Sequence, residues 1–142
     1  MMRYLSLLAV LGLLIFSCAE TDTESSFVRE EDAENGFYLF KLDMPDSLCS
    51  CDFSFYFKAE QAFAGSKRYD IPMDVSWISP SSKTVLKERV YVSGNGNREQ
   101  MQEYRSGVRL SETGEWTIQV YPRDLPSGFQ GLGLTVKRNG AR

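Results

Sequence analysis

Two of the three cysteines of this chain stand close together, as Cys49-Ser50-Cys51. Such a pair could form a redox couple, a disulfide or half of a metal site. A metal would need two more ligands, and the chain has no histidine to provide them. Residues i and i+2 of a strand lie about 7 Å apart, at the outer limit for a disulfide. Because both cysteines alternate in phase with Phe53, Phe55 and Phe57, the pattern favours thiols in a hydrophobic core, with a disulfide as the alternative.

Side chains for catalysis are sparse. The absence of histidine removes the commonest general base and every Ser-His or Cys-His nucleophilic pair. The sequence contains no phosphate-binding loop of the form G-x-x-x-x-G-K-[ST] and no EF-hand calcium loop. Its acidic residues are scattered, and no pair stands at a spacing that forces a shared site. We therefore predict a protein that is not an enzyme and has no catalytic residues, cofactor or metal.

Aromatic residues are the other candidates for a site. Trp77 and Trp116 could stack on sugar rings, but both alternate in phase with aliphatic neighbours, which favours packing in the core. Tyr56 and Tyr121 fall on the polar faces of their predicted strands and are better candidates for exposed contacts.

The N-terminus has the pattern of a secretion signal. Arg3 is followed by the apolar run 5–16, and Ser17 provides a small residue before Cys18. The run is too short to span a bilayer, which takes about 20 apolar residues. We predict a signal peptide over 1–17 and a lipidated Cys18, whose acyl chains, such as palmitate, anchor the protein in a membrane.

The segment after Cys18 is small, polar and acidic. It offers little apolar surface to bury, so we expect a flexible tether over 18–35, followed by one domain over 36–142. Acidic residues in this place resemble the surface-export signals of lipoproteins in the Bacteroidota, and a plain solvated linker is the alternative. The formal net charge of −3 argues against a nucleic-acid partner.

Short alternating stretches separated by Gly, Pro, Ser, Asn and Asp predict about seven strands. Half-buried faces are typical of antiparallel pairing. We therefore predict an all-β, antiparallel β-sandwich, either immunoglobulin-like or jelly-roll-like, with Phe55 and Trp116 inside and one short helical turn at 98–104. The predicted strands are 36–43, 49–58, 71–78, 84–93, 104–110, 115–121 and 129–137.

The C-terminal half of the chain resembles a known family. The resemblance is carried by Trp77-Ile78-Ser79-Pro80, by the strand with Val90 and Val92, by 113–118 (TGEWTI) and by 125–136 (LPSGFQGLGLTV). Together with the signal at the N-terminus, these stretches resemble the gliding-motility-associated (GldH-type) lipoproteins of the Bacteroidota. The resemblance implies an outer-membrane lipoprotein, on the periplasmic or the surface-exposed face, and carries over no catalytic residue.

Two functions fit these features. The first is a non-enzymatic structural or docking component of a cell-envelope assembly, with other envelope proteins as partners and the membrane as its anchor. The second is a glycan-binding module that uses the polar loops 43–48, 94–103 and 122–128. A sugar ring needs a flat apolar surface, which Tyr56, Tyr91 or Tyr121 would have to supply if the tryptophans are buried. The predicted anchor, the acidic tether, the lack of catalytic residues and the resemblance favour the docking component, and glycan binding is the alternative.

Overall fold

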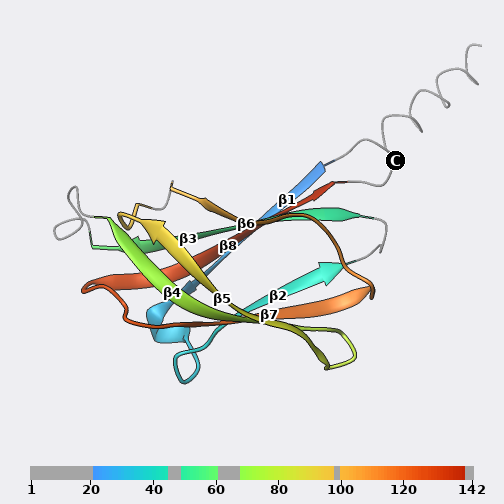
Figure 1. The fold of residues 1–142 in the computed structure, drawn as a ribbon, viewed down its shortest axis with the longest axis horizontal. Helices are drawn as coiled ribbons and strands as arrows, with labels where there is room; N and C mark the ends of the chain where they lie inside the picture. The colour runs from blue at the N-terminus through green and yellow to red at the C-terminus, as the bar shows by residue number, and fades with distance from the viewer. Residues whose placement is uncertain (1–20, 45–48, 61–67, 98–99, 140–142) are drawn as a thin grey trace, which may run out of the picture.

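The computed structural model describes residues 21–44, 49–60, 68–97 and 100–139, so the predicted signal peptide and Cys18 lie outside the described residues. The described chain forms two four-stranded antiparallel sheets packed face to face (Figure 1). This confirms the predicted β-sandwich, with eight strands rather than seven. The strands are β1 (Thr21–Arg29), β2 (Tyr38–Met44), β3 (Ser50–Ala59), β4 (Tyr69–Ile78), β5 (Thr84–Gly94), β6 (Gln102–Arg109), β7 (Gly114–Pro122) and β8 (Phe129–Asn139).

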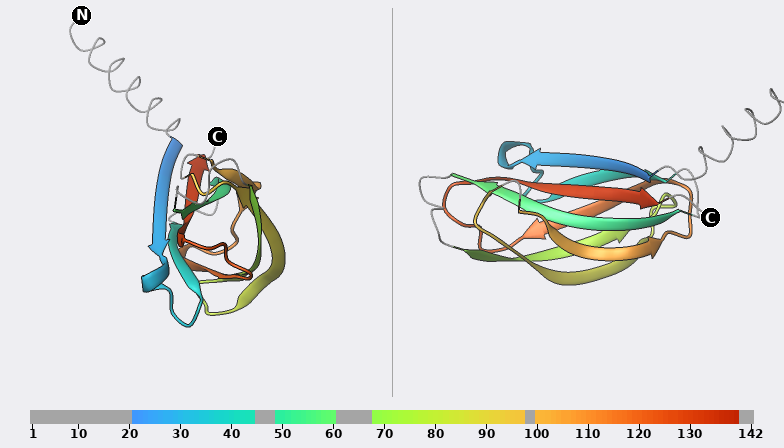
Figure 2. Two further views of the ribbon diagram at one scale, coloured as in Figure 1. Left: turned by 90° about the vertical axis from the view of Figure 1, so that its left-hand side faces the viewer. Right: turned by 90° about the horizontal axis from the view of Figure 1, so that it is seen from above.

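The strand order is that of a jelly roll. One sheet has the order β1-β8-β3-β6 and the other the order β2-β7-β4-β5. Among the described strands, β4 and β5 are the one consecutive pair that shares a sheet, and every other connection crosses between the sheets. Figure 2 shows the two layers curving around a common interior. Eight strands in this order decide between the two expected sandwich types, because they form the paired Greek keys of a jelly roll.

Strand β1 corrects the described part of the flexible tether predicted over 18–35. Its backbone pairs with β8, from Thr21 opposite Asn139 to Arg29 opposite Gly131. The segment is too polar to fold alone, as its composition indicates, but hydrogen bonds to the edge of an existing sheet order it. The folded domain therefore includes β1 and does not begin at residue 36.

Arg138 of β8 holds the first half of β1 in place. Its side chain is only 9% exposed, and Nη1 donates to Asp22 Oδ2 at 3.3 Å while Nη2 donates to Glu24 Oε2 at 2.6 Å. Nη2 also donates to the backbone oxygen of Asp43 in β2, at 3.1 Å. Asp22 and Glu24, which the sequence analysis placed in a solvated tether, thus neutralise the buried guanidinium of Arg138.

Tyr56 corrects a second prediction, because it is buried instead of exposed. It points to the outer face of its sheet as expected, but its neighbour there is Gly133 of β8, which has no side chain to occupy the space. The Tyr56 ring covers Gly133 and stacks on Phe27 of β1, with centroids 6.0 Å apart. Its hydroxyl lies 3.3 Å from Ser25 Oγ, also in β1. A strand that the sequence did not predict therefore buries this tyrosine.

The core lies between the inner faces of the two sheets and contains the residues predicted for it. Phe55, Trp77 and Trp116 are all buried, so neither tryptophan is a surface platform. Cys51 is also buried and Cys49 is half-buried, and both are free thiols. Burial raises the pKa of Cys51 to about 11, so the group is an inert core thiol. The predicted core role is confirmed for Cys51, and the alternative of a disulfide is wrong.

The short helical turn expected at 98–104 is also wrong in its described part. Residues 102–104 belong to β6, and a 3₁₀ helix occurs instead at Glu30–Asp32. The Gln102 side chain favours an extended backbone at residues 102–104. It accepts a hydrogen bond from the Ser93 amide at 2.6 Å and donates one to the backbone oxygen of Tyr91 at 2.7 Å. These bonds fix the start of β6 against β5.

Glu88 closes the side of the sandwich where β5 and β6 meet. Glu88 points inward, on the same face of β5 as its aliphatic neighbours. Arg105 of β6 makes this position favourable, because its Nε and Nη2 donate to the two carboxylate oxygens at 2.9 and 2.6 Å. The Tyr104 hydroxyl donates to the same carboxylate and accepts a bond from Trp77 Nε1 at 2.9 Å. The hydrogen bonds from Arg105 hold the pKa of Glu88 below its usual range.

We expect Glu88→Gln to lower the free energy of unfolding by about 1–2 kcal/mol at neutral pH, because charge-assisted bonds are lost from a partly exposed site. A carboxyl whose pKa is lower in the folded state stabilises the fold above its unfolded pKa of about 4.3. That contribution disappears as the pH falls through the folded pKa. Urea unfolding of both proteins at pH 7 and near pH 3 checks this, since the difference between them should shrink in acid. An equal difference at both pH values would contradict it.

Candidate functional site

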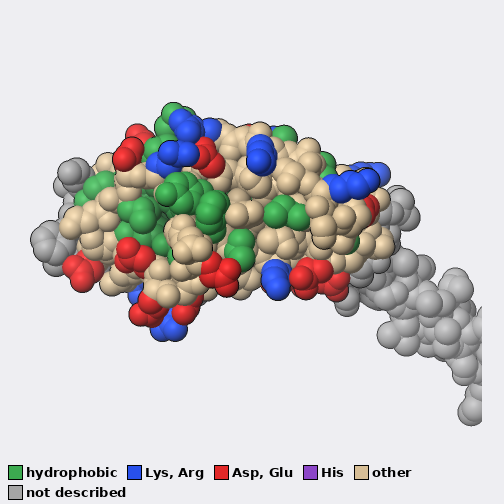
Figure 3. Space-filling view, turned by 90° about the horizontal axis from the view of Figure 1, so that it is seen from below, with side chains coloured by type: hydrophobic (Ala, Val, Ile, Leu, Met, Phe, Trp, Pro, Cys, Tyr) green, Lys and Arg blue, Asp and Glu red, His purple; other side chains and the backbone are tan. Residues whose placement is uncertain are grey.

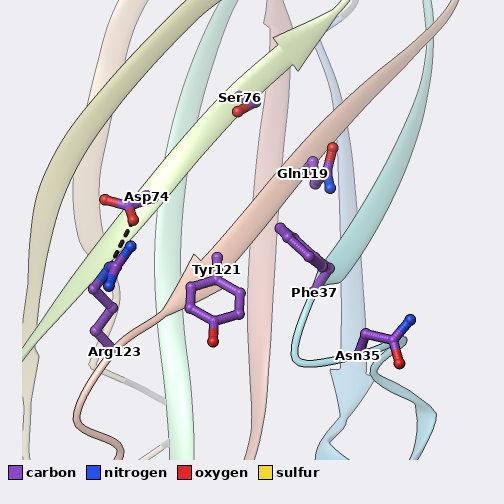
Figure 4. Close-up of a pocket in the computed structure, with 7 residues that line it drawn as sticks. All are labelled: Asn35, Phe37, Asp74, Ser76, Gln119, Tyr121 and Arg123. Carbon is purple, nitrogen blue, oxygen red and sulfur yellow. Dashed lines mark hydrogen bonds and ion pairs between the residues drawn. The ribbon is translucent and has the colours of Figure 1, made fainter.

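A groove of about 430 Å³ lies on the outer face of the β2-β7-β4-β5 sheet. Its walls come from outward positions of β4 and β7 and from the turns next to β2 and β7. Figure 4 shows these side chains gathered over the sheet surface. The residues that line it are Asn35, Phe37, Asp74, Ser76, Gln119, Tyr121 and Arg123.

Strand register brings these residues together. Within β4 and β7, inward apolar residues alternate with outward polar ones, so every second side chain reaches the outer face. Asp74 lies opposite Tyr121 of β7 on one side and opposite Arg89 of β5 on the other. Ser76, two residues along β4, lies opposite Gln119 in the same way. The groove is therefore built on adjacent rows of outward residues that run across the sheet.

The aromatic part of the groove is formed by Tyr121 and Phe37. Their ring centroids are 5.0 Å apart and the rings are tilted by 51°. The Arg123 guanidinium lies over the Tyr121 ring, 5.4 Å from its centroid. Gly36 permits this approach, because its φ is +84° and a Cβ there would lie 2.9 Å from Tyr121 Cε2. The turn before β2 thus carries Phe37 to the tyrosine.

The polar part of the groove is organised by Asp74. Arg89 Nε donates to Asp74 Oδ1 at 2.9 Å, and Arg123 Nε donates to Oδ2 at 2.7 Å. The two hydrogen bonds, from Arg89 first and then from Arg123, lower the pKa of Asp74. One carboxylate therefore holds two cationic side chains, from β5 and from the loop after β7, in fixed positions.

The groove occupies a mixed surface. Figure 3 views this face from below the orientation of Figure 1, and hydrophobic side chains gather toward its left end with charges of both signs around them. A second hollow of about 590 Å³ continues the groove toward β5 and shares Asp74 and Ser76 with it. Its other wall includes Lys87 and Arg89. A ligand on this face meets aromatic rings at one side and basic side chains at the other.

The structure brings together only part of the predicted site. Tyr121, predicted to be exposed, lines the groove, and Tyr91 is 59% exposed on the adjacent edge strand β5. Of the polar loops expected to bind a ligand, the one over 122–128 supplies Arg123. Phe37 and Asp74 were not predicted as site residues. The sequence does show that both alternate with apolar residues that point inward, so their outward direction could have been inferred.

Other kinds of site find no support in the described part of the chain. No group of three or more His, Cys, Asp or Glu side chains there is placed to hold a metal ion. None of the described helices has the length and apolar character to cross a membrane. No protein-family model and no curated protein sequence matches the chain.

Proposed function

We propose that this protein is a non-enzymatic, lipid-anchored component of the bacterial cell envelope whose jelly-roll domain binds a glycan in the groove. The observation that carries the proposal is the pairing of Tyr121 and Phe37 beside the polar groups of Asp74 and Gln119. Sugar rings have apolar faces that pack on aromatic rings and hydroxyl groups that need hydrogen-bond partners. From the sequence, the predicted anchor, the acidic segment after it, the lack of catalytic residues and the family resemblance favour a docking component, and both tryptophans are expected in the core. Tyr121 and Phe37 supply the aromatic platform that buried tryptophans cannot.

The position of the groove fits an anchor at Cys18. Two residues, Ala19 and Glu20, separate Cys18 from Thr21 at the start of β1, so the two Cα atoms are at most about 11 Å apart. Thr21 pairs with Asn139, and the adjacent Arg138 bonds to Asp43 near the end of β2, where Met44 pairs with Gly114 at the start of β7. Tyr121 is near the opposite end of β7, about 23 Å further along at about 3.3 Å per residue. A domain anchored in this way presents the groove away from the membrane.

The first test is glycan binding by the full chain in a detergent that contains no sugar. We expect polysaccharides from the native envelope to raise its melting temperature, because a ligand at 100 times its Kd stabilises the native state by about 2.7 kcal/mol. Tyr121→Ala should abolish the shift. Met101→Ala, which truncates an exposed apolar side chain outside the groove, is the matched control and should retain it. A wild-type melting temperature that no polysaccharide changes would count against the proposal.

The anchor is tested separately. We expect Cys18→Ala to leave the protein without lipid and to release it from the membrane fraction, because the thiol of Cys18 is the proposed attachment point. Fractionation and labelling with a fatty-acid probe measure both effects. Cys49→Ala, which removes a different cysteine and leaves Cys18 and the residues before it unchanged, should remain lipidated. A Cys18→Ala protein that still carried the probe and sedimented with membranes would refute the assignment.

A docking role toward another envelope protein is the second proposal. It is favoured by β5, an edge strand of the same sheet, on which Val85 and Tyr91 are 60% and 59% exposed. Exposed apolar side chains on an edge strand are typical of protein contacts. Crosslinking in native envelopes tests this role. Recovery of one protein partner with the wild type, and its loss with Val85→Asp, would support docking over glycan binding.

A further inference from the structure

We infer that the ligand of the groove is an acidic glycan, and that Arg89 and Arg123 bind its carboxylate group. The inference rests on the proposed function and adds the chemical class of the sugar. It follows from how Asp74 holds the two arginines on the open face of the sheet.

Each guanidinium uses one nitrogen internally and offers the others to a ligand. Asp74 accepts only the Nε–H of Arg89 and of Arg123. Within the described residues, the Nη atoms of these two side chains have no hydrogen-bond partner, and about half of each side chain is exposed. Two planar donor groups thus flank one carboxylate, and each keeps its two Nη atoms available to a ligand. This arrangement suits a carboxylate, which arginine recognises through two parallel hydrogen bonds.

The local charge also favours an anion. Arg89, Arg123 and Lys87 contribute three positive charges to the two adjoining hollows, while Asp74 is the acidic residue that both hollows share. Glu88, which also borders the second hollow, is already paired with Arg105. The two hollows are therefore basic, although the face around them carries charges of both signs and the whole chain has a net charge of −3.

Two other outward acids of this sheet, Asp70 and Glu115, have polar partners of their own. Asp70 is four residues along β4, about 13 Å from Asp74, and its carboxylate accepts a hydrogen bond from Ser93 Oγ. Glu115 of β7 lies 3.8 Å from Lys41 Nζ, with which it forms an ion pair. These acids do not neutralise the basic hollow.

The aromatic rings distinguish a sugar from a simple anion. Tyr121 lies directly across from Asp74, so the platform and the arginines are neighbours in one row. That row crosses the four strands over about 14 Å, at about 4.8 Å between strands, which is longer than one sugar ring. An oligosaccharide with a uronate residue would pack a ring against Tyr121 and Phe37 and place its carboxylate at the Nη atoms of the arginines, away from Asp74.

The test measures binding of the full chain, in a detergent that contains no sugar, by isothermal titration calorimetry. The probes are a galacturonate oligomer, a neutral dextran oligomer and dextran sulfate. We expect the galacturonate oligomer to bind at least about tenfold more tightly than the neutral oligomer, since charge-assisted bonds are about twice as strong as neutral ones. Because exposed charges are screened, this preference should fall as salt is raised from about 0.05 to 0.5 M.

The variants locate the carboxylate. Arg89→Gln and Arg123→Gln should each weaken galacturonate binding at least about tenfold with little change for the neutral oligomer. Arg29→Gln removes the same charge from an exposed side chain on the other sheet and should bind like the wild type. Circular dichroism melting shows whether each variant is folded. If a variant is not, Arg89→Lys or Arg123→Lys replaces it, and the loss of paired donors should still reduce affinity.

The outcomes separate the two proposals. Equal affinity for acidic and neutral oligomers would refute the acidic ligand and leave the glycan site intact. Equal or tighter binding of dextran sulfate, unchanged by Tyr121→Ala, would also refute it by showing general attraction between charges. Failure of every probe and of envelope polysaccharides would refute both proposals.

Discussion

Trp116→Ala is expected to lower the free energy of unfolding by about 3–5 kcal/mol, the usual cost of truncating a buried aromatic side chain. Trp116 is 1% exposed and lies at the centre of its sheet, where β7 runs between β2 and β4. Its Nε1 donates to the backbone oxygen of Glu112 at 2.9 Å, so the substitution removes a hydrogen bond as well as a large apolar surface. Chemical denaturation followed by circular dichroism measures the loss.

The adjacent residue provides the control. Thr117 points to the opposite face of β7 and is partly exposed, so Thr117→Ala should cost at most about 1 kcal/mol. Phe55 is buried in the same core but comes from the opposite sheet. The loss of unfolding free energy for Phe55→Ala should therefore fall in the same range as that for Trp116→Ala. A loss below about 1 kcal/mol at Trp116 would show that the strand faces are assigned one residue out of phase.

Alternation predicted most of the fold because it reports which face of a strand is buried. All seven predicted strands exist, and their bounds differ from the observed ones by no more than two residues. Strand β1 was missed for a physical reason: its stability comes from β8, and Arg138 is 114 residues away from Glu24 in the sequence. Local composition contains no information on such a partner, so a polar segment that pairs with a sheet edge resembles a linker.

The candidate site was predictable only in part, for a related reason. Alternation places Tyr121 and Asp74 on outward faces of β7 and β4, but it does not tell how two strands are aligned. The groove depends on that alignment, since Tyr121 lies opposite Asp74, and on the turn that brings Phe37 to Tyr121. A ligand site made by register across a sheet needs the topology to be known first.

The glycines of β8 show how a fold can depend on an absent side chain. A Cβ at Gly133 would lie 2.0 Å from Tyr56 Cζ, and one at Gly131 would lie 2.5 Å from Phe27 Cζ. The two aromatic rings thus occupy, on the outer face of the sheet, the space above two glycines. Because Phe27 comes from β1, this packing also joins β1 to the rest of its sheet.

Gly133→Ala is therefore expected to lower the free energy of unfolding by about 1–3 kcal/mol, because the methyl group forces the buried Tyr56 ring to move. The φ angle of Gly133 does not oppose the substitution, because it lies outside the left-handed region. The atoms closest to the new methyl group all belong to the Tyr56 ring. Combining it with Tyr56→Ala tests this directly: the double variant should cost clearly less than the sum of the single ones, as expected for residues in contact. Urea unfolding of the four proteins gives the coupling energy. Strictly additive losses would contradict a clash with Tyr56, and a fully stable Gly133→Ala would show that the ring does not lie over the glycine.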